Sequence, residues 1–323
     1  MFKNVMVYRI GEGWSPSLGD VESALLGERF VECGATQDKS VGWAEPRGQD
    51  HGPLVESVGG QWIARLVIES KAVPGNVVRK KLDEQVAGIE AATGRKPGKK
   101  EKRDMQDEIL LSLLPQAFAR QSSVLVWLDM KARRLVLNAG SQGKADEAVS
   151  ALLKALPGLN IALLQTATTP QAAMTEWLLA PQPEDWPTDL CVERECTLKA
   201  TGEDAASIRY VRHHLANDEV RKHVTEGKLP TQLALSWDGR VAFVLTETLT
   251  LKKVQFLDGV MDASGTDKSE DRFDADVALS TGLLSPLLDS LVTALGGEME
   301  WGAAPASPEA AEVTPTTADD PPF

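Results

Sequence analysis

The stretch KAVPGNVVRKKLDEQVAGIEAATGRKPGKKEKR, residues 71–103, differs in charge from the sequence around it. It holds ten basic and four acidic side chains, a net charge of +6. The whole chain has a net charge of −13, so the residues outside this stretch sum to −19. Exposed charges act over about a Debye length, ~8 Å at physiological salt. A polyanion that touches this stretch would therefore respond to its local charge, and the asymmetry points to a polyanionic partner.

The same stretch has a helical pattern. Apolar side chains at positions 78, 82, 86 and 89 predict a helix over about 76–93 with a narrow apolar side. Gly94 and the Pro97-Gly98 dipeptide end it, and a second helix is expected from about Lys100 to Ala119, with Pro115 near its end. Two helices with a short connection form an αα-hairpin. Because they hold little apolar surface, we expect residues 71–117 to project from the protein as a helical finger.

Strands flank this finger. Residues 61–68 (QWIARLVI), 123–129 (SVLVWLD) and 133–138 (RRLVLN) alternate or run apolar as strands do, and the chain opens on a strand over 2–10. A Gly- and Pro-rich loop is expected over about 42–60. Further helices are expected at about 18–29, 144–156, 170–179 and 283–295, with a short one after Asn217. The dipeptide Asp238-Gly239 predicts a hairpin between strands 232–237 and 240–246.

The predicted fold class is α+β, with antiparallel sheets, packed helices and the projecting finger. We expect an N-terminal α/β body formed by residues 1–70 and 118–180, the finger at 71–117, and a strand-rich C-terminal domain at 181–300. Residues 301–323 are rich in Pro, Ala and acidic side chains, a composition typical of a disordered tail.

Several classes of protein are disfavoured by the sequence. No stretch has the pattern of a signal peptide or the run of 18 apolar residues typical of a membrane span. The three cysteines, at 33, 191 and 196, are too few for a disulfide framework, which favours the cytoplasm. No zinc, P-loop or GxSxG pattern occurs. We therefore predict a non-enzymatic protein with no metal, no cofactor and no membrane association.

The basic side chains of the finger are the main candidate site. Clustered Lys and Arg neutralise phosphates and release counterions, which gives affinity without sequence specificity. Acidic residues at i+4 spacing on the same helix do not offset these groups. The alternative is a solvated, charged helix pair without a ligand. The candidates for contact with double-stranded DNA are Arg79, Lys80, Lys81, Arg95, Lys96, Lys99 and Lys100.

Four further residues complete the candidate set. Phe118 and Arg120 stand where the finger rejoins the body, although Phe118 has the alternative of a core anchor. Arg212 and His213 form a smaller basic spot beside His214. The alternative for this spot is an ordinary exposed strand face, and on a strand His213 and His214 would point to opposite sides.

Several stretches resemble the RdgC family of bacterial recombination-associated proteins. The resemblance covers the chain to about Gly297 and is carried by residues 2–9 (FKNVMVYR), 42–43 (GW), 107–110 (DEIL), 112–118 (SLLPQAF), 272–276 (RFDAD) and 295–298 (LGGE).

The resemblance implies a ring-shaped homodimer that encircles duplex DNA without sequence specificity, restrains the RecA recombinase and has no known catalytic activity. The family's fingers correspond to about 71–117 and form one of two contacts that close the ring. Phe118 falls where the family has a phenylalanine of that gate, and Arg212 and His213 align with a polar, basic pair near the hole. His213 departs from the family's amide, and Gln116 replaces a basic residue, which weakens the case for those two contacts.

The basic finger and the resemblance together favour one main hypothesis. The protein is expected to be a cytoplasmic, nucleoid-associated homodimer that binds double-stranded DNA and limits the access of a RecA-type recombinase to that DNA. The alternative is a protein-interaction scaffold whose basic finger holds an acidic partner such as that recombinase. A third class, a nuclease, would require a divalent metal and product formation.

Overall fold

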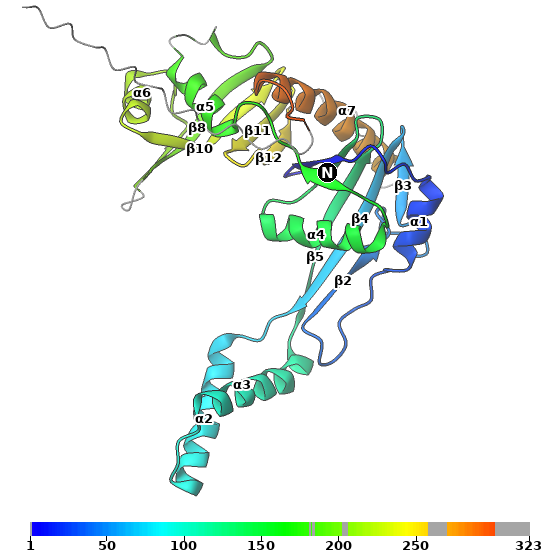
Figure 1. The fold of residues 1–323 in the computed structure, drawn as a ribbon, viewed down its shortest axis with the longest axis vertical. Helices are drawn as coiled ribbons and strands as arrows, with labels where there is room; N and C mark the ends of the chain where they lie inside the picture. The colour runs from blue at the N-terminus through cyan, green and yellow to red at the C-terminus, as the bar shows by residue number, and fades with distance from the viewer. Residues whose placement is uncertain (1, 181, 183–184, 202–205, 258–269, 301–323) are drawn as a thin grey trace, which may run out of the picture.

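The computed structural model describes residues 2–180, 182, 185–201, 206–257 and 270–300, and it shows an α+β protein with two antiparallel sheets (Figure 1). The strands are β1 (Met6–Ile10), β2 (Lys39–Ala44), β3 (Val55–Val58), β4 (Gln61–Lys71), β5 (Ala119–Asp129), β6 (Arg134–Leu137), β7 (Ile161–Leu163), β8 (Leu190–Ala200), β9 (Ser207–Val211), β10 (Lys228–Trp237), β11 (Val241–Thr246) and β12 (Leu251–Phe256). The helices are α1 (Leu18–Leu26), α2 (Gly75–Thr93), α3 (Lys99–Leu113), the 3-10 turn η1 (Leu114–Gln116), α4 (Gln142–Ala155), α5 (Pro170–Leu179), α6 (Asp218–Thr225) and α7 (Glu270–Ala294).

The central part of the first sheet is buried on both faces. Its strand order is β2-β4-β5-β6-β1-β7, and β3 pairs with β4. Successive side chains of a strand point to opposite faces. Accordingly Met6 and Tyr8 of β1 pack in one core with α1 and α4, while Val7 packs in the other core with Trp127 of β5. Such a sheet can hold a projecting element firmly, because both of its faces are fixed by packing.

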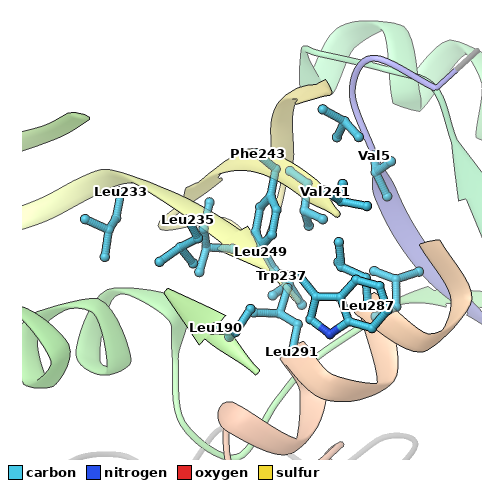
Figure 2. Packing of buried hydrophobic residues seen from close by; sticks show 14 of the residues in the cluster. Val5, Leu190, Leu233, Leu235, Trp237, Val241, Phe243, Leu249, Leu287 and Leu291 are labelled. Carbon is cyan, nitrogen blue, oxygen red and sulfur yellow. The ribbon is translucent and has the colours of Figure 1, made fainter. Parts of the chain in front are cut away.

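The second sheet has the order β12-β11-β10-β8-β9. Helices α5, α6 and α7 cover one of its faces, where Met174, Val220 and Leu287 share a core with strand residues. Figure 2 shows Leu287 and Leu291 of α7 beside Trp237 of β10. By length and composition alone, Arg272–Ala294 could cross a membrane, but its leucines are buried in this core, which marks α7 as a packing helix.

The two sheets are joined through the N-terminus. Val5 and Leu251 exchange both backbone hydrogen bonds, at 2.8 and 3.0 Å, and the N–H of Val254 donates to the carbonyl of Lys3 at 2.9 Å. Residues 3–5 therefore lie beside β12 and pair with it, and the chain then continues as β1 into the first sheet.

The prediction of a loop over 42–60 is confirmed for 45–54 and 59–60 and wrong for the rest. β2 begins at Lys39 and β3 lies within the supposed loop. Gly42 is needed inside β2, because a Cβ there would lie 2.4 Å from the Cα of Phe30. A glycine at a close backbone approach thus masked a strand, while Trp43 beside it is fully buried.

Some predicted helix ends are also wrong. The helix expected to reach Ala119 stops at Leu113, continues as η1 and gives way to β5. Helix α7 starts well before the expected position 283, with Pro286 inside it. The Asp238-Gly239 turn is confirmed, since both residues have positive φ, 49° and 61°. The predicted tail, 301–323, lies outside the described residues.

Candidate nucleic-acid interface

Helices α2 and α3, together called the helical pair, leave the first sheet between β4 and β5. These two strands pair out to the rung Lys71↔Ala119. Figure 1 shows the pair beyond the end of this ribbon, at the opposite end of the molecule from α5 and α6. Only Val78, Ile109 and Leu113 are buried between the helices, with Val73, Leu82 and Leu110 partly buried against them. Most of the pair's surface is therefore available for contact.

Glycines define the turn between the two helices. Gly94 has φ 67°, a left-handed conformation that suits glycine, and its N–H donates to the carbonyl of Glu90 at 2.8 Å. Gly98 precedes α3, and its N–H donates to the Glu101 carboxylate at 3.3 Å. The sequence identified both breaks because the physical requirement is local.

The structure places the seven basic candidates of this region on exposed positions. Arg79, Lys80 and Lys81 lie on α2, and Lys99 and Lys100 form the first turn of α3. Within the described part of the chain, none of these five takes part in an ion pair. Cations at a helix N-terminus oppose the helix dipole. A bound anion would relieve this cost at Lys99 and Lys100, which fits a polyanion at the turn.

Arg95 and Lys96 differ from the other five. Arg95 Nη1 lies 3.1 Å from Glu101 Oε2, and Lys96 Nζ lies 3.4 Å from Glu90 Oε1. Neither pair is an i+4 pair on one helix, so the prediction that such acids do not offset the basic groups stands; the turn brings together residues that helical spacing does not pair. Exposed pairs of this kind contribute only about 0–1 kcal/mol, so an external phosphate can compete for both cations.

Phe118 is 95% exposed, so its alternative as a core anchor is wrong. It stands between η1 and β5, and Arg120 follows on β5 opposite Ser70 of β4. Leu111 is 50% exposed and Val77 is also exposed. These two were missed from the sequence. Leu111 is a sequence neighbour of the apolar positions 109, 110, 113 and 114, and only the packing shows that its side chain lies outside the small core of the helical pair.

Arg212 and His213 lie elsewhere. They follow β9 in a loop, so the idea that His213 and His214 sit on one strand is wrong. The His213 N–H donates to the Arg194 carbonyl at 3.1 Å, and its ring lies 5.1 Å from that of Tyr210. Arg212 and His213 follow a strand of the second sheet, and Figure 1 shows strands β8 and β10 of that sheet at the opposite end of the molecule from the helical pair.

A buried carboxylate at the base of the helical pair was also missed. Glu69 of β4 accepts from the Gln121 side chain and from the Cys33 N–H, both at 2.7 Å. The Gln121 amide and then the Cys33 N–H lower the pKa of Glu69. This network ties the loop before β2 to β4 and β5 at the point where the helical pair begins.

Comparison with known proteins decides the family. A family model described as "RdgC: Putative exonuclease, RdgC" matches residues 1–298. The chain belongs to the RdgC family. A "Recombination-associated protein RdgC" of Dechloromonas aromatica (strain RCB) is 39% identical over 303 residues, covering 92% of this chain and 98% of that protein. Proteins of the same description from Cupriavidus pinatubonensis and Bordetella pertussis are 40% and 36% identical, each covering 92% of this chain and 98% of the relative.

RdgC relatives thus carry two kinds of description, an exonuclease in the family model and a recombination-associated protein in the individual relatives. Among the residues the structure describes, no three His, Cys, Asp or Glu side chains gather as a metal site would require. Burial raises the pKa of the Cys196 thiol to about 12. That thiol is therefore a poor nucleophile at neutral pH.

Proposed function

We propose that this protein binds duplex DNA without sequence specificity through the cationic surface of the helical pair, together with Phe118 and Arg120. The observation that carries the proposal is the concentration of exposed, largely unpaired cations on an element with almost no core. Surfaces of this kind contact phosphates and carry no reading of bases. The exposed Phe118 adds an apolar contact beside them.

In this proposal the protein acts as a homodimer that encircles the duplex. Two features at opposite ends of the protomer support it: the projecting helical pair, and β9, the last strand of the described second sheet, whose outer edge offers backbone groups to another strand. A ring closed at both ends would hold DNA in its hole. Basic side chains that line the hole would attract the polyanion, whereas an acidic outer surface would not.

The biological role we propose is to limit access of a RecA-type recombinase to DNA, without catalysis, in the cytoplasm and at the nucleoid. The descriptions of the relatives as recombination-associated proteins support it. Incubating DNA with the protein and Mg²⁺ or Mn²⁺ tests the non-catalytic part, because any nicked or shortened product would contradict it.

The binding itself is tested by gel shift on random linear and circular duplexes across a salt series, with the oligomer's mass measured in parallel. If about six phosphates are neutralised, log K falls with log salt at a slope near −5. Affinity that does not depend on salt would overturn the proposal.

A matched charge reversal locates the contact. Arg79→Glu with Lys80→Glu should weaken binding to every sequence alike. Lys131→Glu with Lys144→Glu is the control, since both lysines are exposed on the body and form no ion pair within the described residues. Equal effects of the two pairs would mean that only net charge matters.

A protein-interaction scaffold is the second candidate, favoured by the exposed apolar side chains Val77, Leu111 and Phe118. Exposed apolar groups are typical of protein contacts. Capture of the recombinase that survives nuclease treatment, together with no binding to random duplexes, would support this candidate over the first.

A further inference from the structure

The outer face of the second sheet is hollowed. Helices α5, α6 and α7 cover the opposite face, toward which Leu235 of β10 and Phe243 of β11 point. Their neighbours Ala234 and Ala242 lie on the outer face by the alternation of a strand. These small side chains help to line a hollow of about 400 Å³. In the described part of the chain no helix covers it.

Three strands bring charges to this hollow. Lys253 Nζ on β12 donates to the Glu195 carboxylate on β8 at 2.9 and 3.0 Å, although β11 and β10 stand between these two strands in the sheet order. Arg209 of β9 donates to the same carboxylate at 2.8 Å. The Lys253 ammonium and then the Arg209 guanidinium lower the pKa of Glu195. One carboxylate thus holds two cations over a surface of small side chains.

The backbone is strained at two cations that line the hollow. Lys253 has φ 53° and Arg212 has φ 56°. Left-handed conformations are uncommon for residues other than glycine and carry a free-energy cost. The strand pairing shifts near Lys253, between Ala242 and Val244 of β11. Strain that is kept at two places around one hollow points to a role for the side chains it positions.

The charges favour an anion. Arg194, Arg212 and Lys253 line the hollow, and Arg209 adjoins it through Glu195. The opposing carboxylates are Glu195 and Glu193, of which Glu193 accepts from the Ser236 hydroxyl at 2.7 Å. Four cations therefore face two carboxylates. Guanidinium and ammonium groups are the usual partners of phosphate oxygens.

We propose that this face binds phosphate groups of the DNA backbone as a second contact surface, and that Glu195 restrains Lys253 and Arg209 until a phosphate replaces it. The inference rests on the proposed DNA binding. It adds the outer face of the second sheet as a contact surface beside that of the helical pair. Glu195 is a positioning residue in this scheme, because it acts through the two cations and does not touch DNA.

The scheme predicts effects of opposite sign. Glu195→Gln removes the restraint and should tighten duplex binding, by about eightfold at 0.1 M salt if one phosphate contact is gained at a slope of about 0.9. Lys253→Gln should weaken binding by a similar factor and make the salt slope shallower. In the double variant the two effects should not add, because both act on one contact.

The controls come from a comparable ion pair elsewhere. Lys154 of α4 and Glu28 lie 2.5 Å apart on the first-sheet side of the protein. Glu28→Gln changes the total charge as Glu195→Gln does, and Lys154→Gln changes it as Lys253→Gln does, but both controls should leave affinity near that of the natural protein. Lys253→Gly and Arg212→Gly remove charge while suiting the positive φ, so they carry the test if Lys253→Gln does not fold.

The outcomes separate this inference from the proposed function. If the natural protein binds duplexes with a steep salt slope, yet Glu195→Gln and Lys253→Gly bind as it does, the second surface is wrong and the helical pair stands alone. If Glu195→Gln weakens binding, the restraint is wrong. If the natural protein shows no salt-dependent binding at all, the proposed function fails with it.

Discussion

The helical pair and the first sheet use their residues in opposite ways. The sheet is covered on both faces, and its two cores contain tryptophans such as Trp43 and Trp127 with almost no exposure. The helical pair buries three side chains between two helices of 19 and 15 residues. Short helices gain most of their stability from packing. The pair therefore depends on the β4–β5 ribbon that anchors it, and its charged surface is left free for contacts.

The largest effect should follow a cavity in the body. Trp127→Ala removes a ring that packs 5.9 Å from Phe2 and whose indole N–H donates to Gln61 at 2.7 Å. Such substitutions cost about 3–5 kcal/mol. Urea unfolding should show this loss, with the whole body unfolding at lower urea. A cost below 1 kcal/mol would mean that the body is not the stable part.

A smaller and local effect is expected in the helical pair. Ile109→Ala should cost about 2 kcal/mol in the local stability of α3, because Ile109 is one of three buried side chains in this small core. Hydrogen exchange should speed up in α2 and α3, while amides of β5 and β6 keep their rates. Equal loss of protection in the sheet would show that the two regions unfold together.

The base of the helical pair should respond to pH. The lowered pKa of Glu69 means that its carboxylate stabilises the fold at neutral pH, and that this contribution is lost as pH falls through the folded-state pKa. Glu69→Gln should therefore have a lower urea midpoint than the natural protein at pH 7, and the difference should narrow below about pH 4. The exposed Glu12→Gln serves as control, and a difference independent of pH would contradict the assignment.

The smallest effect on stability is expected at Phe118. Because the ring is 95% exposed, Phe118→Ser should change the free energy of unfolding by less than about 0.5 kcal/mol. If DNA or a second copy covers the ring, contact energy of about 1.5–3 kcal/mol is lost. Affinity for duplex or for the second copy then falls about tenfold or more. Leu153→Ser, at a half-exposed position on α4, should leave both affinities unchanged.

The sequence predicted best where the physical requirement is local. Gly94 and Gly98 were found as breaks because a left-handed residue and a helix start depend on neighbouring atoms. The starts of the helix at 170–179 and of the one after Asn217 were found for the same reason, since the side chains of Thr169 and Asn217 accept from Ala172 N–H and Val220 N–H. Asp238-Gly239 likewise predicted its hairpin from two residues alone.

The sequence failed where distant segments meet. β2 was not predicted, because the glycine at position 42 is required by the close approach of the Phe30 backbone, twelve positions earlier in the chain. The carboxylate partners of Arg95 and Lys96 were not predicted, because the turn, not helical spacing, brings Glu101 and Glu90 to them. Glu195 was missed altogether, since its two partners lie on strands separated from it along the chain.

The sequence by itself determined the α+β class and the helical pair with its charge, because these follow from composition, periodicity and local turn chemistry, and it indicated the family through the stretches that resemble it. Only the tertiary structure decided that Phe118 is exposed, which cations have carboxylate partners and that Lys253 of β12 pairs with Glu195 of β8. The physical reason is that burial and ion pairing depend on which surfaces meet in space, and side chains far apart in sequence become neighbours only after the sheets have formed.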